Sequence, residues 1–161
     1  MHIPTVVLDT NTVMALWFFE DPGLSALRAY IESARLRLAC RSDALEELRR
    51  VLAYRQFAID PARQTALLAA YRARVVCIAP PAADASPLPA CRDPDDQKFL
   101  EIARDAGASL LLTRDKALLR LASHRLVRER FGILTPERWL AKAGEVFPQY
   151  VADTADSAPG R

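Results

Sequence analysis

Residues 92–115 read RDPDDQKFLEIARDAGASLLLTRD, and this stretch decides the fold class. Asp93 is placed to cap a helix, Pro94 suits the first helical position, and apolar residues then recur at helical spacing. Gly107 predicts the end of that helix. Residues 109–113, SLLLT, are a short apolar run typical of a strand buried on both faces. The stretch therefore predicts a helix followed by a buried strand, with carboxylates at the helix start and just beyond the strand end.

The same alternation of short apolar runs and helical patterns extends along the rest of the chain. We expect strands at residues 5–8, 36–40, 74–78, 109–113 and 131–134. Helical patterns lie between them and follow the last one. This order predicts an α/β protein, a three-layer α/β/α sandwich around a central parallel sheet. We expect residues 1–150 to form a single domain and the small, polar residues 151–161 to be a disordered tail.

Composition narrows the class of protein without deciding its function. Of the 161 residues, 51% are hydrophobic and 26% are charged, as in ordinary globular proteins. The net charge of +2 neither indicates nor excludes a nucleic-acid binder with a local basic patch. The cysteines Cys40, Cys77 and Cys91 show no paired spacing, which favours a reducing compartment. No apolar run reaches the length of a membrane span, so we expect a cytoplasmic protein without a membrane partner.

Four acidic residues stand at or beside predicted strand or helix ends. They are Asp9, Glu47, Asp96 and Asp115. In open α/β sheets, binding sites lie outside the carboxyl ends of the strands, so these acids are candidates for one shared site. Each also has an ordinary explanation, because aspartates favour helix starts as caps and a glutamate at the border of an apolar stripe is common.

Helical phase separates two neighbouring glutamates. The apolar stripe of the helix predicted from Ser42 leaves Glu46 pointing away from the core, where it can pair with Arg50. Glu47 lies at the border of the stripe and can reach inward. We therefore expect Glu47, and not Glu46, at the site.

A cluster of carboxylates favours a hard divalent cation. Neighbouring carboxylates repel one another, and oxygen-only ligands suit Mg²⁺ or Mn²⁺. Such ions activate water and stabilise the charge that develops on a phosphodiester. The chain has no glycine-rich phosphate loop and no serine elbow, and neither His2 nor His124 is placed to join the acids.

Four motifs in order resemble those of the PIN-domain family. They are VVLDTN at Asp9, ELRRVL at Glu47, RDPDDQKFLEIA at Asp96 and LLTRD at Asp115. FGILTPERWL is similar to the family's closing segment, so the resemblance spans about residues 5–143. It is closest to the PIN-domain toxins of bacterial toxin–antitoxin pairs.

The resemblance implies a metal-dependent endoribonuclease whose four matching acids hold Mg²⁺ or Mn²⁺. Asp96 is preferred over Asp95 because the family acid stands seven residues before the small residue that matches Ala103. Helical geometry alone does not decide between them. Asp93 is expected to cap the helix or to support the site. Asn11 and Thr113 match polar positions near the metal, and each can equally be a cap or a strand-end residue.

The resemblance also implies partners. These are an RNA substrate, an antitoxin protein and a second copy of the chain, with Trp17 and Phe18 as candidates for the homodimer interface. Four arginines are candidates for binding RNA phosphates, although a solvated helix face is the simpler explanation for any single one of them. They are Arg49, Arg50, Arg55 and Arg114.

Three other readings stay open at this stage. A catalytically silent PIN-like binding module has the same fold, but the complete acidic set argues against it. A small metal-dependent phosphatase of the haloacid-dehalogenase type needs a second aspartate where this chain has Asn11. A signalling receiver domain needs paired acids at the first strand, which are missing.

Overall fold

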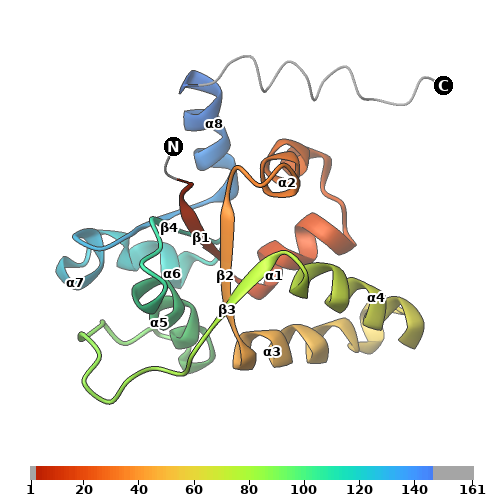
Figure 1. Ribbon diagram of the computed structural model, residues 1–161, viewed down its shortest axis with the longest axis horizontal. Coiled ribbons are helices and arrows are strands. Elements are labelled where there is room, and N and C mark those ends of the chain that lie inside the picture. The colour runs from red at the N-terminus through yellow and green to blue at the C-terminus, as the bar shows by residue number, and fades with distance from the viewer. Residues whose placement is uncertain (1–2, 147–161) are drawn as a thin grey trace.

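The computed structural model describes residues 3–146 and contains one five-stranded parallel sheet with the order β3-β2-β1-β4-β5 (Figure 1). The strands are β1 (Thr5–Leu8), β2 (Arg37–Arg41), β3 (Val75–Ile78), β4 (Leu110–Leu112) and β5 (Gly132–Leu134). The α-helices are α1 (Thr10–Val13), α2 (Ser25–Glu32), α3 (Ser42–Leu52), α4 (Pro61–Arg72), α5 (Gln97–Asp105), α6 (Lys116–Arg120), α7 (Arg125–Arg128) and α8 (Pro136–Val146). The predicted fold class, a parallel sheet covered by helices, is confirmed.

Strand β1 is central and pairs with β2 on one side and β4 on the other. Val6 lies opposite Leu38 of β2 and Leu110 of β4. Val6 and Leu111 are fully buried, as expected for strands covered by helices on both faces. Because all five strands run in one direction, their carboxyl ends meet at the same edge of the sheet.

Helix α5 attaches the acidic stretch to the sheet. It contacts β1, β2 and β4, and Figure 1 places it on the same side of the sheet as α6 and α7, with α1, α2 and α4 on the other side. Leu100 and Ile102 are fully buried, and each such side chain contributes about 1.5–3 kcal/mol to stability. Gly107 follows the helix with φ of 61°, the left-handed conformation that glycine adopts without strain.

Several element boundaries differ from the sequence predictions. The helix after β1 changes from α to π geometry at Met14, and Pro94–Asp96 forms a 3-10 turn ahead of α5. The pattern Leu24–Ala34 predicts a longer helix than α2, but Ala34 has φ of 57° and lies beyond the helix end. The segment between β4 and β5 forms two short helices, α6 and α7.

The buried side chains of the described residues form one hydrophobic cluster that includes residues of the sheet and of helices on both sides. Within residues 3–146, no helix is long and apolar enough to cross a membrane. The predicted tail, residues 151–161, lies outside the described residues.

Candidate functional site

The four predicted acids line one cleft of about 360 Å³ at the carboxyl edge of the sheet. Asp9 and Asp115 lie just beyond the ends of β1 and β4, Glu47 lies on α3, and Asp96 lies in the 3-10 turn ahead of α5. Asn11 and Asp93 line the same cleft. Hollows of similar volume elsewhere, such as one of about 370 Å³ between α3, α4 and β3, carry no comparable set of carboxylates.

Asp9 is buried and rigidly held. One carboxylate oxygen, Oδ1, accepts a hydrogen bond from the Thr12 backbone N–H at 3.0 Å, and Oδ2 accepts one from Thr113 Oγ1 at 2.5 Å. Burial raises the pKa of Asp9, and the bonds from Thr113 and Thr12 partly offset that rise. Asp9 is therefore both the N-cap of α1 and part of the cleft lining, so its two predicted roles, helix cap and candidate site residue, are compatible.

Thr113 links Asp9 to Asp115. It is fully buried, and its Oγ1 also accepts a hydrogen bond from the Asp115 backbone N–H at 2.9 Å. Asp115 in turn caps α6, because its Oδ1 accepts from the Leu118 N–H at 3.0 Å. One hydroxyl therefore sets the relative position of two carboxylates from neighbouring strands.

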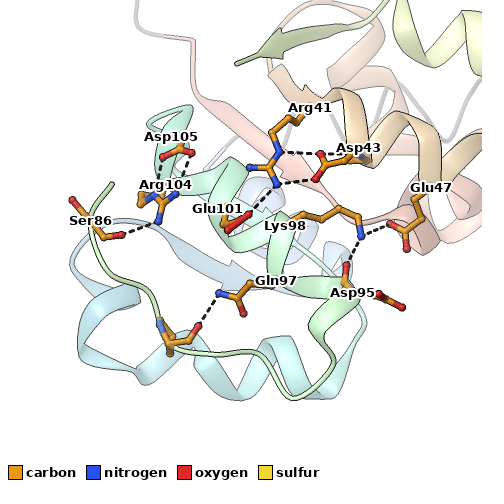
Figure 2. Close-up of polar contacts among 12 residues, drawn as sticks. Arg41, Asp43, Glu47, Ser86, Asp95, Gln97, Lys98, Glu101, Arg104 and Asp105 are labelled. Atoms are coloured by element: carbon orange, nitrogen blue, oxygen red, sulfur yellow. Dashed lines mark hydrogen bonds and ion pairs between the residues drawn. The ribbon is translucent and has the colours of Figure 1, made fainter. Parts of the chain in front are cut away.

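Glu47 is half-buried in the cleft and meets two donors. Thr10 Oγ1 donates to its Oε2 at 2.9 Å, and Lys98 Nζ lies 3.2 Å from the same oxygen (Figure 2). Glu46 is exposed, so the predicted helical phase of the two glutamates is confirmed. The predicted partner of Glu46 is wrong: Arg49 Nε donates to it at 2.9 Å, because residues three apart are helix neighbours as well as those four apart.

Asp96 has a raised pKa within the cleft. Its pKa is raised to about 6, mainly by burial and then by the negative charges of Asp115, Asp93, Asp9 and Glu47. The preference for Asp96 over Asp95 agrees with the geometry, since Asp95 does not line the cleft. Asp93 caps the turn at Asp95 by accepting from its N–H at 2.9 Å.

A family model described as PIN domain matches residues 5–117, which include all four acids. The chain belongs to the PIN-domain family. Members of this family are in general nucleases that use divalent metal ions. A search of curated proteins and a search of solved structures each found no match.

The donor chemistry of this PIN domain fits a divalent cation. In the part of the chain that the structure describes, no three Asp, Glu, His or Cys side chains form a closed group around a point. The acids of the cleft nevertheless offer only oxygen donors, and burial together with the charges of the neighbouring acids raises the pKa of Asp96. Asp9, Glu47, Asp96 and Asp115 are the residues that would hold Mg²⁺ or Mn²⁺.

Two residues at the site of the PIN domain were not predicted. Thr10 and Lys98 both contact Glu47, which brings α1 and α5 against α3. Because Asp9 caps α1, the Thr10 hydroxyl can donate to Glu47. Lys98 follows Asp96 by two residues, and no sequence pattern indicates that its side chain returns to Glu47.

The four candidate arginines do not line the cleft of the PIN domain. Arg49 lines the separate hollow beside α4. Arg114 donates to Asp21 at 2.9 Å and to Glu137 at 2.8 Å. Arg50 and Arg55 are exposed near the end of α3.

Proposed function

We propose that this PIN domain is a Mg²⁺- or Mn²⁺-dependent endoribonuclease and the toxin of a type II toxin–antitoxin pair. The observation that carries the proposal is the convergence of Asp9, Glu47, Asp96 and Asp115 on one cleft at the carboxyl edge of the sheet. The nuclease class follows from the family. The choice of RNA and the toxin role rest on the resemblance of the four motifs.

The cleft residues have different roles in the proposed reaction. A bound divalent ion supplies an activated water and neutralises charge on the phosphodiester. Thr113 orients Asp9, and Thr10 with Lys98 orients Glu47, so these carboxylates present fixed oxygens. Asp96 releases its proton more readily once a cation offsets its neighbours.

Water is the nucleophile under this proposal. Within the described residues, no serine, cysteine or histidine lines the cleft. Attack by water on phosphorus leaves a 5′-phosphate and a 3′-hydroxyl. A silent binding module has less support because the acidic set is complete, and a phosphatase has less support because Asn11 cannot protonate the leaving group.

Cleavage of single-stranded RNA tests the proposal. We expect products with Mn²⁺ or Mg²⁺, none with EDTA, and a loss of at least about 100-fold in Asp9→Asn. Asparagine caps a helix as well as aspartate does, so this variant keeps the fold while removing the charge. Full activity of Asp9→Asn, with a melting temperature equal to that of the wild type, contradicts the assignment.

The proposed partners are the antitoxin and a second copy of the chain. Trp17 is a poor candidate for the homodimer interface, because it is 6% exposed and packs on Tyr71 at 5.4 Å between ring centroids. Phe18 is half-buried against Phe57. Both aromatic rings are used within the protomer.

A further inference from the structure

Two aromatic side chains line the acidic cleft beside the carboxylates. They are Tyr54, which is 48% exposed, and Phe57, which is half-buried. Their rings lie 6.2 Å apart between centroids with an interplanar angle of 15°, so they present nearly parallel faces. We name this pair the aromatic ledge. About half of the Tyr54 surface is exposed where the residue lines the cleft, so a ligand in the cleft can contact it.

The ledge is positioned by the same helix that carries Glu47. Glu47, Val51 and Tyr54 all line the cleft. Glu47 and Val51 are four residues apart on one face of α3, and Tyr54 follows two residues beyond the end of the helix at Leu52. The Tyr54 N–H donates to the Val51 carbonyl at 3.0 Å, and the Phe57 N–H donates to the Tyr54 carbonyl at 3.1 Å. The backbone of the ledge is therefore continuous with the helix that presents the acid.

Further aromatic rings extend the ledge away from the acids. Phe18 and Phe19 lie 5.7 and 5.6 Å from Phe57 between ring centroids, and Phe19 is 56% exposed. The guanidinium carbon of Arg63 lies 5.3 Å from the Phe18 centroid. Core packing accounts for Phe18, but it does not account for the exposure of Phe19 and Tyr54.

The acidic cleft by itself should bind RNA weakly, because both carry negative charge. Acids line it, the candidate arginines lie elsewhere, and the one lysine that reaches an acid of the cleft, Lys98, is paired with Glu47 in the described part of the chain. Metal ions held by the acids would offset the charge of the scissile phosphate but not the charges of the neighbouring phosphates. Affinity for the neighbouring nucleotides has to come from contacts that do not depend on charge, and stacking on an aromatic face is one of these.

We propose that the aromatic ledge of Tyr54 and Phe57 binds an unpaired base of the substrate next to the scissile phosphodiester. This inference rests on the proposed nuclease function and assigns a binding place to one nucleotide of the single-stranded substrate. Bases in a duplex are stacked on one another, so their faces cannot reach the ledge. An unpaired base can leave its stack and lie on Tyr54, while its phosphate faces the acids.

Binding measured without cleavage tests the ledge. The experiment uses the Asp9→Asn protein in Mg²⁺ and the fluorescence anisotropy of a labelled single-stranded oligoribonucleotide. A second oligonucleotide of equal length and charge has its bases removed along the central segment. We expect Tyr54→Leu in this background to weaken binding of the intact strand by about 5- to 50-fold and of the abasic strand by less than about twofold.

Two further variants complete the test. Tyr54→Trp should keep the affinity, because it keeps an aromatic face. Ile3→Ala, an exposed apolar residue at the opposite edge of the sheet, should change nothing. An equal loss on both strands, no loss in Tyr54→Leu, or no binding of the intact strand overturns the proposal. Cleavage by the wild type is assayed separately, so failure of the ledge is distinguishable from failure of the nuclease assignment.

Discussion

At the scale of one residue, Asp96 shows how a buried carboxylate beside other acids lowers the stability of the metal-free protein. Its folded pKa of about 6 lies above the ordinary value of 3.8, so the folded protein holds this proton more tightly than the unfolded chain. The contribution of Asp96 to stability therefore falls as the pH rises from about 3.8 to about 6 and stays low above that range. At neutral pH the carboxylate is ionised against its neighbours.

Asp96→Asn removes a buried negative charge and its repulsion with the neighbouring carboxylates. In EDTA at pH 7.5 we expect the variant to melt about 2–4 °C above the wild type, which is the effect of about 1 kcal/mol in a domain of this size. The gain should shrink at pH 5 and disappear below about pH 3, where the wild-type carboxyl is neutral in both the folded and the unfolded state. Thermal unfolding at three pH values measures it. A gain that grows as the pH falls contradicts the assigned direction of the pKa.

At the scale of elements, Arg41 joins α3, which carries Glu47, to α5, which begins directly after Asp96. It lies at the end of β2 with a side chain only 6% exposed, and its guanidinium donates to Asp43 of α3 at 2.8 and 2.9 Å and to Glu101 of α5 at 2.9 Å (Figure 2). Its Nη1 is buried and has no hydrogen-bond partner among the described residues. The site therefore depends on a contact that lies outside the cleft.

Arg41→Met tests this clamp. The loss of a buried arginine with two carboxylate partners should lower the free energy of unfolding by about 2 kcal/mol, below the range for fully buried pairs because Asp43 is half-exposed. Urea unfolding measures it. Arg49→Met is the matched control, since its ion pair with Glu46 lies in solvent and its removal should leave the stability unchanged. Equal stability of Arg41→Met and wild type would refute the clamp.

Local pattern predicted the elements well where one signal dominated. Residues 109–113 are apolar at nearly every position, and the segment forms the buried strand β4. The apolar stripe of α3 is sharp enough to set the phase of Glu46 and Glu47. Boundaries near the helix starts were less accurate, because several hydroxyl and carboxylate residues there compete for the cap, and at α1 the cap is Asp9.

The tertiary contacts of the site were not predictable from local pattern. Lys98 reaches Glu47 across two helices that are about 50 residues apart in the sequence, and this contact depends on how α3 and α5 pack on the sheet. Tyr54 follows Glu47 by seven residues, about two helical turns, and this spacing can be seen in the sequence. Its use as a cleft wall follows only from the turn that ends the helix.

At the scale of the whole molecule, we expect a second copy of the chain to pack against the edge strand β3. Val76 is 51% exposed on this strand, and the hollow between α3, α4 and β3 is lined partly by apolar side chains. We expect light scattering to give twice the mass of the chain, and Val76→Lys to give the monomer by placing a charge on the edge. A monomeric wild type at high concentration contradicts the homodimer.

The central claim is that the cleft acids, and not acidic residues in general, perform metal-dependent cleavage. The most direct measurement compares the Mn²⁺-dependent cleavage rates of Glu47→Gln and Glu46→Gln on one single-stranded RNA. The two changes are chemically identical and one residue apart, but Glu47 lines the cleft and Glu46 is exposed. We predict a loss of at least about 100-fold for Glu47→Gln and an unchanged rate for Glu46→Gln. Equal rates for the two variants, or a loss confined to Glu46→Gln, would contradict the account.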